Sequence, residues 1–325
     1  MTSLRSWHRN RPSGAAGVPR TDLEVKVGSV VLPNPVMTAS GMAGHGAELS
    51  RYVDLGALGA VVVKSLSAEP WDGNPAPRVH QTDGGMLNSV GLQNPGVEAW
   101  IEHELPALLA TGARVVASIW GRTVESYEKA ATMLAGCPAE VVAVEVNLSC
   151  PNLGRNHQMF AHSAEAAAEV IAATAACSRP RWAKLSPNTP DVVPIAGAVL
   201  EAGAEAVTLV NTVMGMAIDP STRRPRLGAG AGGLSGAAIR PVAVRAVYEC
   251  RRSFPDAAIV GVGGIATGEH AAELLVAGAN AIQVGTATFD DPRATARVRD
   301  ELARWCAAHH VRRVADLIGS AHGTA

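Results

Sequence analysis

Short apolar runs recur along the chain, and most are followed by an Ala-rich segment of helical period. Apolar and polar positions do not alternate within the runs, as expected for strands that are covered on both faces. Eight runs have this pattern, at residues 36–40, 60–64, 115–119, 141–147, 182–185, 206–211, 258–262 and 281–284. Helical spacing is found at residues 46–55, 97–110, 124–134, 163–177, 190–202, 241–252, 267–277 and 292–308. Repeated strand–helix units pair in parallel, so the pattern predicts an α/β fold, a (β/α)8 TIM barrel, with an open doubly wound sheet as the alternative.

Signals outside these runs add to the expected architecture. Residues 23–32 contain a Gly-Ser pair between two Val-rich segments, which predicts an N-terminal β-hairpin that plugs the barrel floor. The connections at 65–95 and 212–240 are too long for turns, so we expect long active-site loops there. Residues 1–22 are expected to form a flexible basic tail, and residues 23–325 a single barrel domain. Helix N-caps are expected at Thr123, Ser163, Thr189 and Thr267.

Composition narrows the class of protein. Of the 325 residues, 47% are hydrophobic and 18% are charged, and the formal net charge is -1, which argues against a nucleic-acid or membrane-surface partner. The five cysteines include no C-x-x-C pair, so we expect neither a disulfide framework nor a metal or iron–sulfur site within this chain. No apolar stretch is long enough to span a bilayer, and the basic start lacks a secretory core. Free cysteines suit the reducing cytoplasm, where we expect the protein.

Polar residues gather where the predicted strands end, which is where barrels of this kind place their active sites. Lys64 and Lys184 each close an apolar strand and could bind an anion or, as in aldolases, form a Schiff base; a solvated lysine at the rim is the bland alternative. Asn88, Asn147, Asn152 and Asn211 bring amides to the same region. An amide offers a donor and an acceptor together, which suits the edge of a cyclic imide or pyrimidine, although each Asn alone is more often a turn former.

The last two strands end in small residues, Gly263-Gly264 and Gly285-Thr286. Barrels commonly bind phosphate at these two places through backbone N–H groups, so we expect a phosphorylated ligand. Residues 261–266 also match the dinucleotide pattern G-x-G-x-x-A, but no acidic residue follows to hold a ribose, and tight turns are the bland alternative. Cys150 follows a strand and precedes a proline, so its thiol is a candidate base or nucleophile at the barrel mouth.

Together, these motifs resemble dihydroorotate dehydrogenase. The resemblance rests on NLSCPN at 147–152, NSVGLQNPG at 88–96, KLSPN at 184–188, VNT at 210–212 and GGLSG at 232–236, and it extends from about Val25 to the last helix. It is strongest to the class 1B catalytic subunit, because GNPAPR at 73–78 and the short loop at 152–160 fit that branch. The membrane-bound class is less similar, since it has serine in place of Cys150. Strand three departs from the pattern, with Ser118 where some class 1B members have Asn, followed by Trp120.

The resemblance implies an FMN-dependent barrel that oxidises (S)-dihydroorotate to orotate in pyrimidine biosynthesis. Cys150 would remove the C5 proton while the C6 hydride passes to the flavin. The substrate would be held by Lys64, Asn88, Val90, Gly91, Leu92, Asn147, Asn152, Asn211 and Thr212. FMN would be held by Ser40, Lys64, Ser65, Ser118, Asn147, Lys184, Val210, Gly236, Gly263, Gly264, Gly285 and Thr286, the last four around its phosphate.

The resemblance also implies partners. A barrel homodimer would pass electrons to NAD through an iron–sulfur subunit that contains FAD, whereas class 1A behaviour would be a homodimer that uses fumarate directly. Three other functions remain open from the residues alone: an FMN enzyme acting on another dihydropyrimidine, a lysine-dependent aldolase-type barrel, and a barrel subunit without enzymatic activity.

Overall fold

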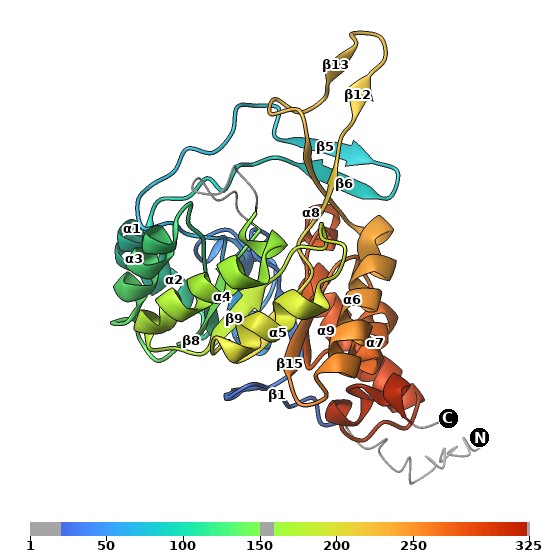
Figure 1. Cartoon of the computed structure of the whole chain (residues 1–325). Coiled ribbons are helices and arrows are strands. Elements are labelled where there is room, and N and C mark those ends of the chain that lie inside the picture. Colours follow the sequence, from blue (N-terminus) through green and yellow to red (C-terminus); the bar gives the residue numbers. More distant parts are fainter. Residues whose placement is uncertain (1–20, 150–158, 324–325) are drawn as a thin grey trace, which may run out of the picture.

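Eight parallel strands form the centre of the molecule in the computed structural model, which describes residues 21–149 and 159–323 (Figure 1). The strands are β3 (Val36–Thr38), β4 (Val61–Val62), β7 (Val115–Ile119), β8 (Val141–Asn147), β9 (Arg181–Lys184), β10 (Ala206–Leu209), β15 (Ala258–Val262) and β16 (Ala281–Val284). They are hydrogen-bonded in the order β3-β16-β15-β10-β9-β8-β7-β4. Each strand overlaps one of the eight predicted runs, so the strand predictions are confirmed.

The two end strands of this sheet meet and close the barrel. The backbone N–H of Gly59 donates to the carbonyl of Val36 at 2.8 Å, and the N–H of Thr38 donates to the carbonyl of Ala60 at 3.3 Å. The Thr38 hydroxyl accepts from the N–H of Val62 at 2.9 Å, so a side chain supplies part of this seam. The closed sheet confirms the (β/α)8 prediction and removes the open doubly wound alternative.

Helices surround the barrel, most of them within the predicted ranges. They are α1 (Val97–Ala99), α2 (Leu105–Leu109), α3 (Val124–Leu134), α4 (Ala164–Ala173), α5 (Val193–Glu201), α6 (Arg240–Ser253), α7 (Gly268–Ala277), α8 (Ala287–Asp290) and α9 (Ala294–Ala308). Short 3-10 segments are η1 (Glu48–Arg51), η2 (Leu55–Ala57), η4 (Phe160–His162), η5 (Thr174–Cys177), η6 (Ala237–Ile239), η7 (Val314–Leu317) and η8 (Ser320–His322). Thr123, Ser163 and Thr267 accept backbone N–H groups at the starts of α3, α4 and α7, as predicted for N-caps.

Three helix predictions need correction. Residues 46–55 contain the 3-10 segment η1 and the first residue of η2 instead of one helix, because the Asp54 side chain accepts from the N–H of Gly56 and starts a new turn. Residues 97–110 contain the π-helical segment η3 (Trp100–Glu104) between α1 and α2; Pro106 has no N–H to donate, and the N–H of Leu105 bonds five residues back to Trp100. Thr189 does not cap α5, since Asp191 accepts from the N–H of Val193 at 2.9 Å instead.

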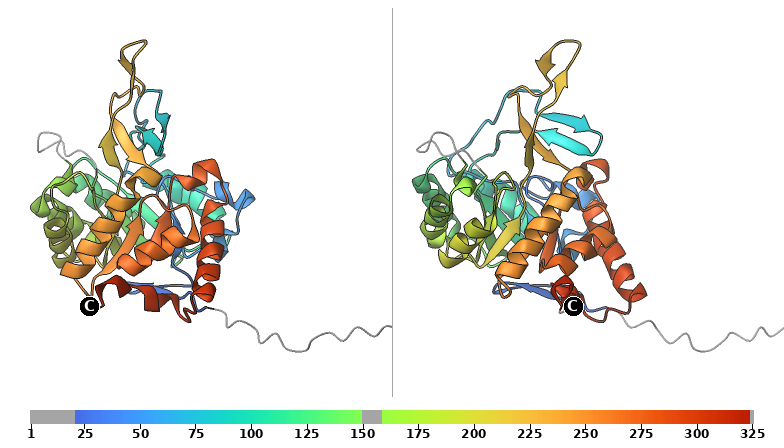
Figure 2. Two further views of the ribbon diagram at one scale, coloured as in Figure 1. Left: turned by 90° about the vertical axis from the view of Figure 1, so that its right-hand side faces the viewer. Right: turned by 45° about the vertical axis from the view of Figure 1, so that its right-hand side comes forward.

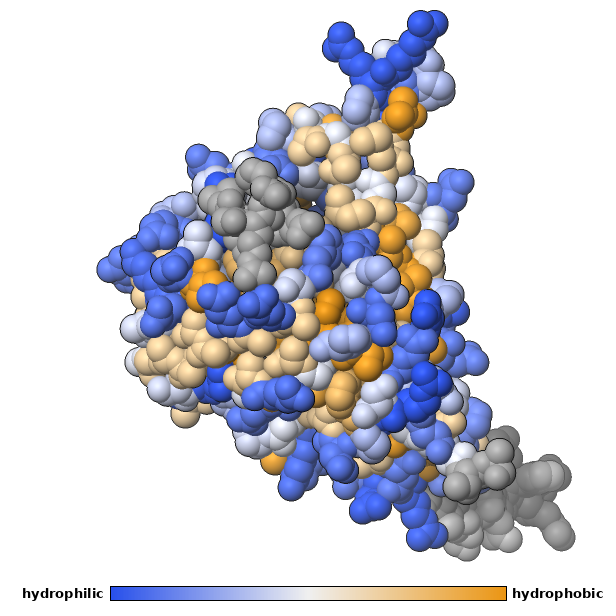
Figure 3. Space-filling model, in the orientation of Figure 1, coloured by the Kyte–Doolittle hydropathy of each residue, from blue (hydrophilic) through white to orange (hydrophobic). Residues whose placement is uncertain are grey.

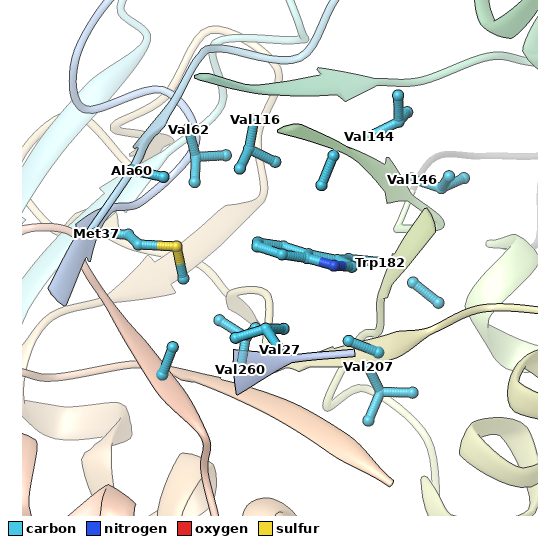
Figure 4. Close-up of a cluster of buried hydrophobic side chains, with 14 of the residues drawn as sticks. Val27, Met37, Ala60, Val62, Val116, Val144, Val146, Trp182, Val207 and Val260 are labelled. Atoms are coloured by element: carbon cyan, nitrogen blue, oxygen red, sulfur yellow. The ribbon is translucent and has the colours of Figure 1, made fainter. Parts of the chain in front are cut away.

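An N-terminal hairpin lies against the lower end of the barrel. Strands β1 (Val25–Val27) and β2 (Val30–Leu32) pair antiparallel, and Gly28 turns the chain with a φ of +60°. Figure 4 shows Val27 among the side chains of the barrel core, close to Val260 and Trp182. Val27 and Trp182 are fully buried, so the prediction that the hairpin plugs the barrel floor is confirmed.

The two long connections are more ordered than predicted. Strands β5 (Val79–Thr82) and β6 (Gly85–Asn88) lie in the first, and β11 (Val213–Gly215), β12 (Ile218–Asp219), β13 (Arg224–Pro225) and β14 (Gly232–Ser235) in the second. They pair across the barrel mouth as the sheet β11-β14-β6-β5, which we call the lid sheet. The β12–β13 hairpin, which we call the arm, projects away from the barrel in both views of Figure 2. The loops were expected, but their strands were not.

The described termini lie together beneath the barrel. The N–H of Asp22 donates to the carbonyl of Arg312, and the N–H of Val314 donates to the carbonyl of Asp22, both at 2.8 Å. The basic tail falls mainly on residues outside the described ranges, so it and the domain boundary stay predictions. Among the residues that the structure describes, no helix is long and apolar enough to cross a membrane.

Candidate active site

A cavity of about 360 Å³ lies between the barrel mouth and the lid sheet. Its volume is in the range of small-molecule sites. The predicted site residues that line it are Ser40, Lys64, Ser65, Asn88, Val90, Gly91, Leu92, Asn147, Lys184, Val210, Asn211, Thr212, Gly236, Gly263, Gly264, Gly285 and Thr286. Cys150 and Asn152 lie outside the described residues, although Ser149, the residue before Cys150, lines the same cavity. The structure therefore brings one end of the predicted catalytic segment to the predicted binding residues.

Two asparagines are hydrogen-bonded to each other at the cavity wall, and a third holds the chain beside them. The Asn211 amide nitrogen donates to the Asn147 Oδ1 at 3.2 Å, and the Asn147 amide nitrogen donates to the Ser65 hydroxyl at 3.3 Å. Asn188 donates to the carbonyl of Thr212 at 2.9 Å and fixes the chain after β10. Because hydrogen bonds to neighbouring groups already orient these three amides, they present a fixed arrangement of donors and acceptors to a ligand.

Three serine hydroxyls are connected at this wall, two of them on residues that line the cavity. The Ser65 Oγ lies 3.3 Å from the Ser40 Oγ and 2.9 Å from the Ser118 Oγ. Ser118 is fully buried and is not among the residues that line the cavity. The Ser118 hydroxyl therefore meets the cavity through Ser65 in this structure, and its predicted contact with a cofactor stays a prediction.

The two predicted lysines have different surroundings. The Lys184 Nζ lies 3.2 Å from the Glu145 Oε1, and both side chains are buried. Lys64 also borders the cavity, and burial, followed by the nearby charge of Lys184, holds the pKa of its ammonium below the usual value. An anionic ligand group beside Lys64 would offset both effects, so the site favours an anion there.

The loop at 88–96 approaches the cavity in a constrained conformation. Gly91 and Leu92 have φ values of +74° and +64°, in the left-handed region that favours glycine. The Trp71 indole donates to the carbonyl of Gly91 at 2.9 Å, and the N–H of Asn74 donates to the carbonyl of Val90 at 3.0 Å. The segment that precedes the lid sheet therefore holds the loop in place.

Trp120, which departs from the family pattern, also helps to hold the loop at 88–96, because it packs against Trp71. Its ring meets Trp71 edge to face, with ring centroids 6.0 Å apart. The Arg122 guanidinium lies 3.8 Å from the centroid of the Trp71 ring. The large residue after β7 thus packs behind the loop that carries Gly91.

At the ends of β15 and β16, glycine turns border the cavity. Gly263 and Gly264 have φ values of +138° and +70°, and a side chain on Gly264 would meet Arg240 at 2.5 Å. At Gly285 an added Cβ would come no closer than 3.6 Å to Ala39, so the backbone there is accessible without strain. Bare backbone at the ends of β15 and β16 suits a phosphate group.

Sequence reasoning missed several residues at or under the cavity. Asn74 and Asn188 line it, while Glu145 and Gln283 lie inside the barrel below Lys184. Glu145 and Gln283 could have been recognised, because each is a lone polar residue within an apolar strand. Asn74 could not, since its position depends on how two distant segments pair.

The chain is similar to known dihydroorotate dehydrogenases. A family model described as dihydroorotate dehydrogenase matches residues 22–305. A protein of Solibacter usitatus, named putative dihydroorotate dehydrogenase A (fumarate), is 46% identical over 92% of this chain and 98% of its own length. The catalytic subunit of dihydroorotate dehydrogenase B (NAD(+)) from Geobacter sp. strain M21 is 45% identical over 93% of this chain and 98% of its own. The subunit of that name from Alkaliphilus metalliredigens is 44% identical, with shares of 93% and 99%.

Proposed function

This chain belongs to the dihydroorotate dehydrogenase family, and from that premise we propose that it oxidises (S)-dihydroorotate to orotate in pyrimidine biosynthesis. The family consists of oxidoreductases, which argues against the aldolase and non-enzymatic alternatives. The observation that carries the proposal is that Lys64 and the amides of Asn88, Asn147 and Asn211 line one cavity. Dihydroorotate combines a carboxylate with a cyclic imide, and these side chains complement both parts.

The substrate would be held by its two polar regions. Lys64 would bind the carboxylate, helped by the backbone of residues 90–92, and Asn88, Asn147, Asn211 and Thr212 would bind the ring. Asn152 would join them from outside the described residues. Dihydrouracil lacks the carboxylate and would leave Lys64 unpaired in a buried site, so we expect at least about a hundredfold preference for dihydroorotate in kcat/KM. Equal kcat/KM values for the two substrates would favour the alternative of another dihydropyrimidine.

FMN is the flavin that this cavity suits. Ser40, Ser65, Lys184, Val210 and Gly236 would contact its ring and ribityl chain, with Gly263, Gly264, Gly285 and Thr286 around the phosphate. Bound FMN would supply the two-electron acceptor for the oxidation. Support comes from the accessible backbone at Gly285 and from the family, in which FMN dependence is characteristic. The purified protein, supplemented with FMN, should be yellow and release one FMN per chain on denaturation.

Cys150 is proposed as the base that removes the C5 proton. Replacing Cys150 with Ala should leave FMN bound and lower dihydroorotate oxidation by about 10² to 10⁴-fold, the usual cost of losing a general base. Cys150→Ser should keep weak activity at higher pH. Cys177→Ala is the matched control, because burial raises the pKa of that thiol and removes it from chemistry. An unchanged rate and pH profile in Cys150→Ala would remove the cysteine from the mechanism.

The electron acceptor is the second part of the proposal, because the relatives' names divide between fumarate and NAD(+). We favour a separate subunit that contains FAD and an iron–sulfur cluster, on the basis of the GNPAPR segment at 73–78 and the relatives named catalytic subunits. The reduced lone chain should then react slowly with both NAD and fumarate in stopped-flow mixing. Fast reoxidation by either compound without another protein would contradict the need for that subunit.

A barrel homodimer and a cytoplasmic location complete the proposal. Met216 and Ile218, at the base of the arm, are 54% and 58% exposed, and Figure 3 shows apolar surface there below the hydrophilic tip. Exposed apolar residues on a projecting hairpin support protein–protein contact. Cys137, Cys177, Cys250 and Cys306 are free thiols, which suits a reducing compartment. Sedimentation of the lone chain should give twice the monomer mass.

A further inference from the structure

A buried polar cluster lies inside the barrel below the cavity. Glu145 on β8, Lys184 on β9 and Gln283 on β16 meet there, and the Glu145 side chain is fully buried. The Glu145 Oε1 lies 3.2 Å from the Lys184 Nζ, and its Oε2 accepts from the Gln283 Nε2 at 2.6 Å. Both carboxylate oxygens thus have partners, and the carboxylate is held from two sides.

Stability alone does not explain this cluster. A buried ion pair loses its hydration, and its replacement by apolar residues of similar volume is often neutral or stabilising. The neighbouring barrel interior is apolar, with Met37, Trp182 and Val260 packed together (Figure 4). An apolar residue in place of Glu145 would continue that packing. We therefore look for the role of the Glu145 carboxylate in its effect on Lys184, the charged group that it faces and that lines the cavity.

The Glu145 carboxylate changes the electrostatic potential that the two lysines create at the cavity. Lys64 and Lys184 border the same cavity, and the charge of Lys184 disfavours the charged form of Lys64. Glu145 lies close to Lys184, whereas the structure shows no carboxylate bonded to Lys64 among the residues it describes. Glu145 thus reduces the positive potential of Lys184 in the cavity and leaves Lys64 as the stronger anion site.

We propose that Glu145, braced by Gln283, is a positioning residue that fixes the Lys184 ammonium at the cavity floor and limits how strongly it stabilises negative charge on a bound flavin. The inference rests on the proposed function, because it requires FMN in this cavity. A cation next to a flavin ring favours every state in which the ring becomes negative. A carboxylate directly behind that cation weakens the effect, so removing the carboxylate charge makes the flavin a stronger acceptor of negative charge.

Glu145→Gln is the conservative test of this idea. The new amide oxygen can accept from Lys184, and Gln283 can rotate its own amide to accept from the new NH₂, since the Gln283 Oε1 is buried without a hydrogen-bond partner in the described structure. The change therefore removes the charge and retains the shape. Glu128→Gln, at an exposed position of α3, makes the same chemical change away from the cavity and serves as the control.

The affinity for sulfite measures directly how strongly the site stabilises negative charge on the flavin, and the measurement requires no turnover. The sulfite lone pair forms a bond to flavin N5, and the displaced ring electron pair becomes negative charge on the pyrimidine part of the ring, so no further reactant is needed. Titrating the FMN-loaded proteins with sodium sulfite, followed by loss of flavin absorbance, should show about tenfold tighter binding in Glu145→Gln. The control Glu128→Gln should match the unmutated protein.

A second variant should shift the dissociation constant in the opposite direction. Gln283→Leu keeps both charges and removes the donor that shares the carboxylate, so Glu145 neutralises Lys184 more fully and sulfite should bind about threefold more weakly. Unchanged sulfite affinity in both variants, with only a lower melting temperature, would show a purely structural role and overturn the inference. If the unmutated protein reacts with dihydroorotate but the variants bind sulfite equally, only this inference fails. If it binds no FMN at all, the proposed function fails with it.

Discussion

The barrel wall and the lid sheet contribute to the same cavity in different ways. Wall residues such as Asn147 and Lys184 are almost fully buried, on strands whose neighbours on both sides are hydrogen-bonded. Lid residues such as Val79 and Met214 are 53% and 48% exposed, on a sheet that stands above the mouth. The wall can therefore hold charged groups and amides in fixed positions through hydrogen bonds. The lid sheet mainly covers the cavity and determines its shape.

This difference suggests a division of labour. Most of the groups that we propose to contact the flavin, including both lysines and the glycine turns after β15 and β16, come from the wall, whereas Gly236 directly follows β14 of the lid sheet and Asn88, which we assign to the substrate, lies on β6 of that sheet. Val90 to Leu92, which we assign to the substrate, belong to a loop that Trp71 and Asn74 hold from outside the barrel. Substitutions in the wall should therefore affect FMN affinity and the rate of the reaction. Substitutions near the lid should affect substrate affinity, and those in the arm should affect association between chains.

The largest effect is expected at the wall, for an anion placed beside the phosphate. Gly285→Asp should weaken FMN binding by more than about a hundredfold, because two unit charges at 4 Å repel by about 4 kcal/mol at an effective dielectric of 20. Gly285→Asn has nearly the same size without the charge, and an added Cβ meets only Ala39 at 3.6 Å, so it should bind FMN far better. Equal FMN dissociation constants for the two variants, measured by fluorescence, would place the phosphate elsewhere.

A pH-dependent effect is expected at Lys64. Burial and the charge of Lys184 lower its pKa, and the lysine must be protonated to bind a carboxylate, so affinity is lost as the pH rises through that pKa. The dissociation constant of orotate should then increase tenfold per pH unit. Burial, followed by the charge of Lys64, also lowers the pKa of the neighbouring His45. Lys64→Arg should abolish the dependence, and a flat profile in the unmutated protein would contradict the assignment.

A smaller effect is expected in the support of the substrate loop. Trp71→Phe retains the ring over which Arg122 lies but removes the hydrogen bond to the carbonyl of Gly91. One such bond contributes about 1 kcal/mol, so KM for dihydroorotate should rise about fivefold with FMN affinity unchanged. A parallel loss of FMN affinity would show that Trp71 supports the wall as well as the loop.

The smallest effect on the barrel itself is expected for the arm. Ile218→Asp replaces an exposed apolar residue and should leave the flavin spectrum and the half-reaction with dihydroorotate within about 0.5 kcal/mol of the unmutated protein. Its effect should be confined to association, measured as a shift toward monomer in sedimentation. Thr222→Asp, in the exposed turn of the same arm, is the control for added charge. A slowed half-reaction in Ile218→Asp would connect the arm to the chemistry.

The contrast between the barrel wall and the lid sheet also explains which features the sequence could predict. The wall strands are short buried runs whose pattern is local, and most of the site residues predicted at their ends line the cavity, Ser118 being an exception. The lid sheet depends on pairing between residues 86–88 and 233–235, which no local pattern encodes. The identity of the cavity amides could be predicted, but the hydrogen bond from Asn211 to Asn147 could not, because it depends on the stagger of neighbouring strands. The predictions of a helix at 46–55 and of an N-cap at Thr189 were wrong because the side chains of Asp54 and Asp191 accept hydrogen bonds from backbone N–H groups there.

The central claim is that this cavity holds FMN and dihydroorotate in contact. Anaerobic titration of the FMN-loaded protein with dihydroorotate, followed at the flavin absorbance band, tests it most directly. The account predicts bleaching of the flavin with formation of one orotate per FMN reduced. Full bleaching by dithionite, combined with no response to excess dihydroorotate, would contradict it.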